Sequence, residues 1–376
     1  MTSVAIVGGK LQGTEAVYLA KKAGFRSLLI DKNVNAPASG FCDEMGAFDV
    51  RKKEGRLIDF LRQADFILPA LENDEAHAAL IEISREYGFK LAFDARAYSI
   101  THSKLKTDRL IREYKVPAPR YYPESDGPYI IKPSEESGSS GVSRVETADE
   151  VKRFLNEVKD PESWVVQEYL EGPSYSVEII GIPGMYRTYE TTKIHMDEVY
   201  DCKMVTAPCA ISQSKKERFS EIAKTLAAAV GLHGIMDVEV IDHEGELKVL
   251  ELDARIPSQT PIAVLHCSGI NLLSELADIV LLGGFTDEQP KRQRHTAVEH
   301  YLVDRTGVFW KGEHMMTESR PLMYRENFFG ADEVVSDYNG SNITWRGEFI
   351  NSAETEDGLK QKRFEMLRKL NEGMRE

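Results

Sequence analysis

Three acidic residues and an arginine have the types and spacing of a metal site. The segment VLELDARIPSQT places Glu251 and Asp253 two residues apart in a predicted strand, with Arg255 two residues further on. Alternate residues of a strand project from the same face, so these side chains should converge. A hairpin with the upstream run HGIMDVEVI would add Glu239. Carboxylate oxygens suit Mg²⁺, and a nearby arginine can stabilise negative charge that develops during reaction, so the pattern predicts a site for magnesium and polyphosphate.

The composition and charge limit the classes of partner. The chain has 376 residues, of which 42% are hydrophobic and 29% charged, as in globular proteins with two or three domains. The net charge of −14 and the pI of about 5.3 argue against nucleic acid or an anionic membrane as the main partner. A local basic pocket for a nucleotide is still compatible with this charge.

The cysteines and the N-terminal segment bear on the cellular compartment. Four scattered cysteines without a CxxC pair indicate reduced thiols. The segment MTSVAIVGGK lacks the basic start and long apolar core of a signal peptide, and no apolar run approaches the roughly 20 residues needed to cross a bilayer. We therefore expect a cytoplasmic protein without a membrane-spanning segment.

Residues 3–95 alternate short apolar runs with helical patterns. SVAIV, SLLID, ADFILPA and KLAFD are predicted strands, and helices are predicted around 12–23, 54–63 and 74–87. This order predicts a doubly wound parallel sheet. The turn GGKLQG could hold an anion or ligand at the start of a helix. It lacks the full G-x-G-x-x-G spacing, although Asp31 ends the second strand where a ribose-binding acid would lie, and a simple tight turn fits the pattern equally well.

A glycine-rich loop between two strands is the main feature of the next segment. The helical stretch SKLKTDRLIREY runs into VPAPRYY, whose prolines end it, and a domain boundary is expected near residue 95. In PYIIKPSEESGSSGVSRV, Lys132 closes the first strand and precedes a loop from Ser134 to Gly141. Such a loop can fold over phosphates and donate backbone N–H groups. The spacing differs from a Walker loop, and a plain mobile hairpin is the alternative.

The order of these motifs resembles that of the ATP-grasp superfamily of carboxylate–amine ligases. Within it, the chain is most similar to the ligases of pyrrolysine biosynthesis, in the segments VGGKLQGTEAVYLAKKAG, HMDEVYDCKMVT, GIMDVEVI, ELDARIPSQTP and CSGINL. The resemblance spans nearly the whole chain. It implies an α/β ATP-grasp architecture with a doubly wound N-terminal domain over residues 1–95, a small subdomain with the loop over 96–170, a large subdomain with the metal site over 171–285, and a C-terminal domain over 286–376.

The resemblance also implies roles for individual residues. Arg255 is the expected catalytic residue, and the expected metal ligands are Glu239, Glu251 and Asp253. The expected ATP-binding residues comprise two lysines, the loop and the strand that holds adenine: Lys104, Lys132, Ser134, Ser137, Gly138, Ser139, Gly141, Gln167, Glu168, Tyr169 and Leu170. Two positions depart from the superfamily pattern. Asp253 stands where these enzymes commonly have asparagine, and Ser174 stands where many have a glutamate that binds the ribose. Glu178 could take the role of that glutamate.

The substrate residues are expected in three segments. His195 and Asp201 lie in a polar segment that could bind ammonium groups, although a solvated acidic loop is an equal alternative. Ser258, Gln259 and Thr260 could contact a carboxylate or simply cap a helix. In the N-terminal domain, Lys10, Leu11, Gln12 and Glu72 should face the same cleft, because ligands of open α/β sheets bind at the carboxyl ends of the strands.

The implied reaction is ATP-dependent formation of an amide bond through an acyl phosphate, giving ADP and phosphate. The implied partners are ATP, Mg²⁺ as two ions, 3-methyl-D-ornithine as acyl donor and the ε-amine of L-lysine as nucleophile. A homodimer is also expected, although no interface is identified. The alternatives are a related ligase with another amino-acid or purine-pathway substrate, a nicotinamide-dependent oxidoreductase using GGKLQG and Asp31, and a protein that binds ATP without catalysis.

Overall fold

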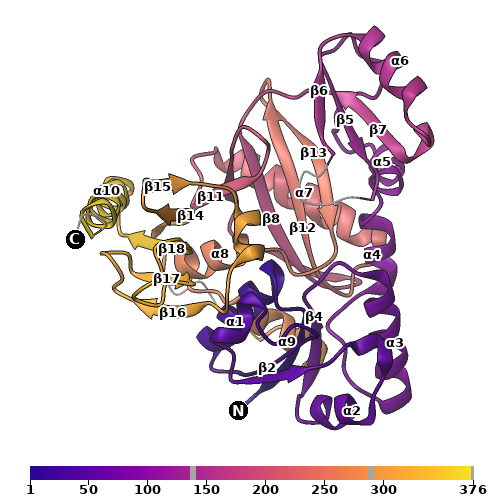
Figure 1. Ribbon diagram of the computed structural model, residues 1–376. Coiled ribbons are helices and arrows are strands. Elements are labelled where there is room, and N and C mark those ends of the chain that lie inside the picture. The colour runs from indigo at the N-terminus through magenta and orange to yellow at the C-terminus, as the bar shows by residue number, and fades with distance from the viewer. Residues whose placement is uncertain (136–140, 287–291, 374–376) are drawn as a thin grey trace.

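The computed structural model describes residues 1–135, 141–286 and 292–373. Within them the chain forms a four-stranded, a three-stranded and an eleven-stranded sheet. Figure 1 shows the N-terminal sheet below, the three-stranded sheet at the upper right, and the large sheet between them and the C-terminal helix. The predicted mixed α/β class is confirmed.

The N-terminal sheet is parallel, with the strand order β3-β2-β1-β4. Its elements are β1 (Ser3–Val7), α1 (Leu11–Ala23), β2 (Arg26–Asp31), β3 (Glu44–Ala47), α2 (Gly55–Leu61), β4 (Phe66–Pro69) and α3 (Asp74–Tyr87), with short 3₁₀ turns η1 (Pro37–Gly40) and η2 (Val50–Lys52). The predicted strand KLAFD is wrong, since only Leu91 forms a bridge, to Ile67. The chain leaves the sheet there because Asp94 caps the next helix with its side chain.

The three-stranded sheet is antiparallel and carries its own small core. Its elements are β5 (Tyr129–Pro133), β6 (Ser143–Val145), α6 (Ala148–Glu157), η3 (Pro161–Ser163) and β7 (Trp164–Glu168), in the strand order β6-β5-β7. Thr147 and Glu150 form a capping box that fixes the start of α6. Two helices, α4 (Ala95–Thr101) and α5 (Lys104–Glu113), connect this unit to the N-terminal sheet.

The large sheet runs through the centre of the molecule with the main order β13-β12-β8-β10-β11-β14-β18-β17-β16. Its first strands are β8 (Ser174–Ile182), β9 (Met185–Thr188), β10 (Thr192–Met196), β11 (Cys202–Ala207), β12 (Gly234–His243) and β13 (Glu246–Asp253). Its later strands are β14 (His295–Asp304), β15 (Gly307–Trp310), β16 (Met323–Glu326), β17 (Glu333–Ser336) and β18 (Trp345–Ala353). Its strands pair antiparallel, and its edge strands β13 and β16 come from the middle and the end of the chain.

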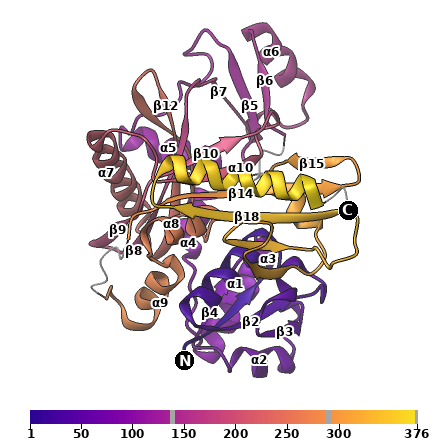
Figure 2. The ribbon, with the colours of Figure 1, turned by 90° about the vertical axis from the view of Figure 1, so that its left-hand side faces the viewer.

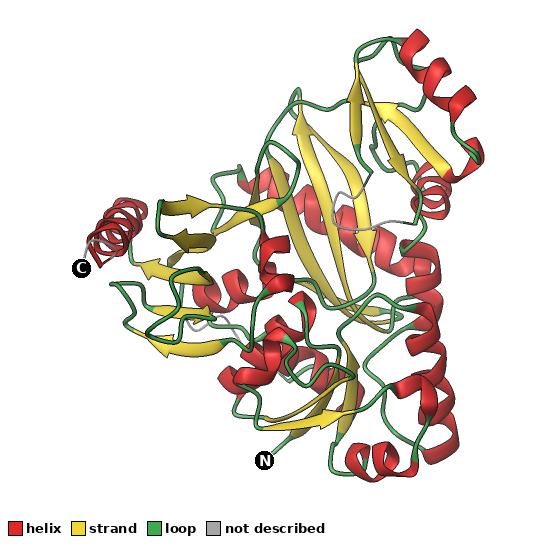
Figure 3. Cartoon of the chain, viewed as in Figure 1, coloured by secondary structure: helices red, strands yellow, loops and turns green. Residues whose placement is uncertain are grey.

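Helices cover the large sheet and join it to the N-terminal sheet. They are α7 (Gln213–Val230), α8 (Thr260–Ser268), α9 (Leu272–Leu282), η4 (Glu313–Glu318) and α10 (Glu356–Gly373). Figure 2 shows α10 lying along β14 and β18. Helix α1 packs against α8 and α9, and one continuous apolar core extends from β1 through α8 and α9 to β18. Helices and strands of both regions therefore share a single interior (Figure 3).

Among the described residues, no single helix is long and apolar enough to cross a membrane. The pair α8 and α9 meets the length and composition criteria only when taken together, and these helices meet at 99°. Many of their side chains belong to the buried core described above.

Candidate active site

The acidic hairpin predicted from the sequence is present as β12 and β13. The register places Glu239 opposite Glu251, and Asp237 opposite Asp253. Paired residues of antiparallel strands project from the same face, so four carboxyl groups share one side of the hairpin. Lys104, the first residue of α5, brings its Nζ to 3.2 Å from Glu251 Oε1. Two acidic pairs of the hairpin and a lysine of α5 thus meet at one place.

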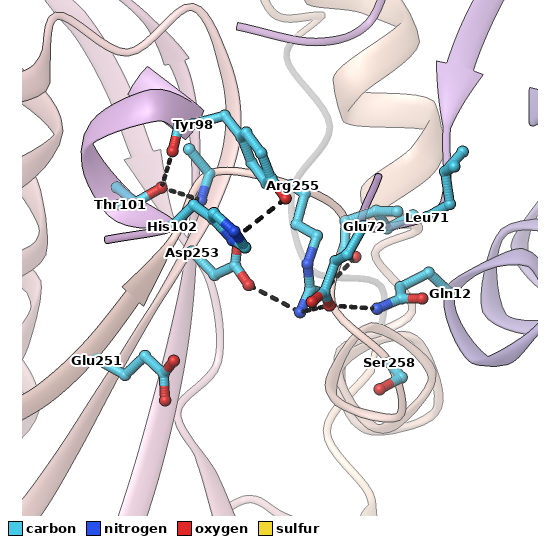
Figure 4. A network of polar contacts seen from close by, with 12 residues as sticks. Gln12, Leu71, Glu72, Tyr98, Thr101, His102, Glu251, Asp253, Arg255 and Ser258 are labelled. Carbon is cyan, nitrogen blue, oxygen red and sulfur yellow. Dashed lines mark hydrogen bonds and ion pairs between the residues drawn. The ribbon is translucent and has the colours of Figure 1, made fainter. Parts of the chain in front are cut away.

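Arg255 lies just beyond the end of β13 and connects two parts of the molecule. Its Nη2 is 2.7 Å from Asp253 Oδ2 and 2.5 Å from Glu72 Oε1. Gln12 Nε2 donates to the same Glu72 oxygen over 3.0 Å. Figure 4 shows the guanidinium between the acid of the hairpin and the acid that follows β4. Burial lowers the pKa of Arg255, but the charges of Asp253 and Glu72 outweigh it and hold that pKa above its ordinary value.

A first cavity of about 320 Å³ lies between the small and the large antiparallel sheets. It brings together most of the predicted ATP-binding residues and two predicted metal ligands: Lys104, Lys132, Gln167, Glu168, Tyr169, Leu170, Glu239 and Glu251. Ser174 also lines it. The carboxylate of Glu168 pairs with Arg120 and Lys248, and although burial opposes it, this pairing lowers the pKa of Glu168 to about 2. That side chain therefore holds the strand in place, while its backbone borders the cavity.

The predicted phosphate loop is described only at its two ends. Ser134 is buried, and its hydroxyl lies at the start of α5, 3.2 Å from Ser103 Oγ and 3.3 Å from the backbone N of Leu105. Gly141 has a φ of +72°, and a Cβ there would approach the ring of Pro133. The predicted residues Ser137, Gly138 and Ser139 lie outside the described residues. Lys132 is buried beside the loop, and burial lowers the pKa of its ammonium.

A second cavity, of about 170 Å³, adjoins the first and shares Met196, Tyr200, Glu239 and Glu251 with it. It gathers predicted site residues around the end of the acidic hairpin: the predicted metal ligand Asp253, the predicted catalytic residue Arg255, and the predicted substrate residues Asp201, Ser258, Gln259 and Thr260. It also contains three residues that the sequence reasoning did not single out: Asp237, Glu313 and His314. His314 Nδ1 is 2.8 Å from Asp201 Oδ1, and Ser258 donates to Glu313 over 2.7 Å.

A third cavity, of about 780 Å³, opens at the carboxyl ends of the parallel strands. Lys10, Leu11, Gln12 and Glu72 line it, as the topology predicted, together with Asp31. His314 lines both this cavity and the second one. Of these residues, Glu72 contacts Arg255 and Gln12 contacts Glu72, so the third cavity adjoins the end of the acidic hairpin.

Two predicted site residues are not where the hypothesis requires them. His195 lines none of these three cavities, because its neighbours Ile194 and Met196 occupy the side of β10 that borders the second cavity. Its ring lies on the other side of the sheet, where Nε2 is 3.0 Å from Thr206 Oγ1 and the charge of Arg363 of α10 is nearby. Glu178 is fully buried and lies outside the nucleotide cavity. Its register partner is Asp237, two residues along β12 from Glu239, so the structure does not bring Glu178 together with the predicted ATP-binding residues of the first cavity.

Glu15 of α1 is a structural contact that the sequence reasoning missed. One carboxylate oxygen accepts the backbone N–H of Gln259 over 3.0 Å, and the other accepts that of Ile262 over 2.8 Å. These bonds hold the start of α8, where Gln259 adopts a φ of +64°. Burial and the nearby Glu348 raise the pKa of Glu15 well above its ordinary value. An acid within a predicted helix gave no signal that it would contact a distant loop.

The acids of the hairpin fit a hard divalent cation. Burial, followed by the charge of Glu251, raises the pKa of Glu239 to about 8, and burial raises that of Asp253 to about 7 despite Arg255. Such shifts mark negative charge that the surrounding protein leaves largely uncompensated. Among the described residues, Asp237 Oδ1 and Asp253 Oδ1 have no hydrogen-bond partner. Oxygen donors in this state suit Mg²⁺.

Known proteins with similar sequence and structure identify the family. The ATP-grasp domain family matches residues 101–259. The 3-methyl-D-ornithine--L-lysine ligase of Methanosarcina mazei is 37% identical over 309 residues, which are 82% of this chain and 80% of that protein. Among solved structures, an ADP complex of N5-carboxyaminoimidazole ribonucleotide synthetase has a TM-score of 0.73 at 13% identity, covering 99% of this chain and 98% of that one. The L-amino acid ligase of Bacillus licheniformis has a TM-score of 0.69 at 16% identity, covering 97% of both chains.

These structural likenesses confirm the predicted ATP-grasp fold, and the sequence identity is high and extensive enough to show the family. The first cavity, the acidic hairpin and Arg255 lie in one continuous region of the molecule. The chain therefore belongs to the 3-methyl-D-ornithine--L-lysine ligase family of ATP-grasp enzymes.

Proposed function

We propose that this enzyme joins the carboxylate of 3-methyl-D-ornithine to the ε-amine of L-lysine, with conversion of ATP to ADP and phosphate. The observation that carries this proposal is the 37% identity, over 82% of the chain, to ligases named for these two amino acids. The adjoining cavities for a nucleotide and for polar ligands support it. The reaction takes place in the cytoplasm, where the four free cysteines would stay reduced. The active form is a homodimer.

The first cavity holds ATP. The four domains that surround the site have the boundaries given in the sequence analysis. Gln167, Tyr169 and Leu170 border the adenine end, whereas Lys104 and Lys132 lie at the phosphate end beside the acids. Two buried lysines next to carboxylates provide the positive charge that a polyphosphate needs. Ser134 and Gly141 are the described ends of the predicted phosphate loop, and residues 136–140 lie outside the described residues. Exclusion of water from the phosphates would protect an activated carboxylate from hydrolysis.

Glu239 and Glu251, with Asp253 beside them, hold Mg²⁺ as two ions. When bound, Mg²⁺ offsets the charge of the phosphates. The acidic pair is aligned by the hairpin register, and Lys104 contacts Glu251 directly. The protein therefore fixes the relative positions of the metal-binding oxygens and of one phosphate-binding lysine before any ligand arrives.

Activation of the carboxylate makes amide formation possible. The carboxylate oxygen of the acyl donor attacks the terminal phosphorus of ATP and forms an acyl phosphate, from which phosphate leaves more readily than hydroxide would. Arg255 lies at the boundary of the second and third cavities and stabilises the oxyanion that forms when the amine attacks. The amine must be neutral to attack the acyl phosphate. Acids that line the second cavity, including Asp201 and Glu313, are the candidates that accept its proton.

Phosphate release in the presence of Mg²⁺ tests the proposal. The purified protein should release phosphate from ATP only when an ornithine-type acyl donor and L-lysine are both present, and mass spectrometry should detect the isopeptide product. Other amino-acid pairs and purine-pathway substrates serve as controls. Release that depends on one of these controls instead, or tight binding of NAD without ATP turnover, would contradict the proposed function.

A further inference from the structure

Helix α4 connects the two chain segments at the open end of the acidic hairpin. At the start of the helix, Asp94 Oδ2 accepts the backbone N–H of His233, the residue before β12, over 2.9 Å. At its end, Thr101 Oγ1 accepts the backbone N–H of Ala254, the residue after β13, over 3.0 Å. One short helix therefore holds both ends of the β12–β13 pair.

The Thr101 hydroxyl is buried and oriented for this contact. Thr101 is 3% exposed and Ala254 is 2% exposed. The hydroxyl donates to the carbonyl of Tyr98 over 3.4 Å, which leaves its oxygen free to accept from Ala254. Thr107 of α5 donates to the Thr101 carbonyl over 3.3 Å and so fixes the end of α4 as well. A buried backbone N–H without an acceptor is unfavourable, so the Ala254 N–H depends on this hydroxyl.

The contact lies at the point where β13 leaves the large sheet. The last pair of the hairpin is Asp237 with Asp253, although the remaining residues of β12, Gly234 to Met236, still pair with β8. Continued pairing of β13 would bring Arg255 opposite Ile235, a residue of the apolar core. Because the Ala254 N–H bonds to Thr101 instead, the chain turns away from β12 before Arg255.

This turn determines where the guanidinium of Arg255 lies. Asp253 is still held by its pairing with β12, so a displacement of Ala254 would fall mainly on Arg255. Figure 4 shows Thr101 on the same side of the network as Asp253, with Arg255 between Asp253 and Glu72. Thr101 itself lines none of the three cavities. Its effect on the site therefore passes through the backbone of Ala254.

We infer that Thr101 is a positioning residue for the reaction, which holds the Ala254 backbone so that Arg255 reaches the developing oxyanion. This inference rests on the proposed function and adds a residue outside the cavities on which the catalytic arginine depends. The required property is a hydrogen-bond acceptor at this position. Threonine and serine supply it, whereas valine and alanine do not.

Thr101→Val tests the inference, because valine has nearly the same shape but no acceptor. In the full-length enzyme with ATP, Mg²⁺, an ornithine-type acyl donor and L-lysine, kcat should fall about 10- to 100-fold, as expected when a catalytic group is misplaced by up to about 1 Å. The KM for ATP should change by less than about 3-fold, since catalysis and nucleotide binding use different contacts. Lys104 has its own anchor, because its backbone N–H donates to the Ser134 carbonyl over 3.0 Å.

Three further variants separate positioning from stability. Thr101→Ser keeps the hydroxyl and should keep kcat close to the wild-type value. Thr296→Val removes a different buried threonine hydroxyl, which is 3.1 Å from Ser352 Oγ in the large sheet, and it should lower the midpoint in urea without a change in kcat. Thr101→Ala repeats the test if the valine variant does not fold.

A double-mutant cycle shows whether Thr101 acts through Arg255. Arg255→Ala removes the group that Thr101 positions, so the addition of Thr101→Val should cause no further fall in kcat. A loss in the double variant that equals the product of the two single losses would overturn the inference, because Thr101 would then affect the reaction by another route.

The outcomes separate this inference from the proposed function. Absence of isopeptide with the wild type would contradict the proposed function, and the Thr101 variants would then be compared in the ATP turnover that the enzyme supports. Wild-type kcat in both Thr101→Val and Thr101→Ala would overturn the inference. Hydrogen exchange at the Ala254 amide, followed by mass spectrometry, should be faster in Thr101→Val. An unchanged exchange rate would overturn the inference whatever the substrates are.

Discussion

Individual charged residues at the centre of the molecule are held by ion pairs between distant parts of the chain. Arg255 is the clearest case, since it contacts an acid of the large sheet and an acid of the N-terminal sheet at once. Its spacing from Glu251 and Asp253 was visible in the sequence, and its position near them is confirmed. The contact with Glu72 was not predicted as an ion pair, because no local pattern relates residues so far apart in the chain.

Replacement of Arg255 by alanine should reduce turnover much more than nucleotide affinity. Removal of a group that stabilises a developing oxyanion typically raises the barrier by about 3 kcal/mol, so kcat should fall about 100- to 1,000-fold. Binding of ATP, measured by calorimetry with Mg²⁺, should weaken by less than about 3-fold, since binding and catalysis use different contacts. Arg62→Ala, at an exposed arginine that pairs only with Asp59 among the described residues, is the control. An equal loss of ATP affinity would contradict the assigned role.

At the level of elements, the start of α8 depends on a helix from the other end of the chain. Ser258, Gln259 and Thr260 were predicted to follow the metal strand, and they do so. Their conformation, however, is fixed by Glu15 of α1, which accepts two backbone N–H groups there. Helix N-termini leave such donors unsatisfied, and a carboxylate stabilises them through hydrogen bonds and through the helix dipole.

Glu15→Ala should therefore affect both stability and the site. Loss of the cap should reduce the free energy of unfolding by about 1–2 kcal/mol, seen as a lower midpoint in urea. The KM for an amino-acid substrate should rise, because Gln259 and Thr260 line the second cavity. Glu15→Gln keeps one oxygen acceptor and should give an intermediate result. A variant with reduced stability but unchanged KM values would show that α8 does not need Glu15 for its position at the site.

For the whole molecule, three sheets are arranged so that one site lies where they meet. The first cavity lies between the small and the large antiparallel sheets, and the third cavity opens at the parallel sheet. The opposite face of the large sheet is covered by α10, and there the structure holds His195. Burial, and then the charges of Lys193, Arg363 and Lys203, lower the pKa of His195 to about 4.

This shift predicts a loss of stability in acid. The unfolded chain binds a proton at His195 near pH 6.5, whereas the folded protein does so only near pH 4. Between these values the unfolded state holds more protons, so stability is fully present above about pH 6.5 and falls as the pH decreases toward 4. His195→Asn should show a smaller decrease of melting temperature over this range than the wild type. Identical slopes would disprove the assignment, and turnover at neutral pH should stay unchanged because His195 lies outside the three cavities.

The sequence by itself determined the features that depend on short spacing. The alternation of strands and helices near the N-terminus, the hairpin that pairs Glu239 with Glu251, and the order of lysines and acids along the chain all follow from local periodicity. For the same reason the helices predicted around 12–23, 54–63 and 74–87 and in SKLKTDRLIREY lie within a few residues of the observed α1, α2, α3 and α5.

Only the tertiary structure decided which distant groups meet. It placed Glu15 beneath α8, Glu72 against Arg255 and Asp237 opposite Asp253, and it left His195 and Glu178 outside the three cavities. A strand pattern specifies two faces, but the neighbouring strands and helices determine which face is covered and which borders a cavity. Contacts of this kind arise from packing between elements, and no local spacing encodes them.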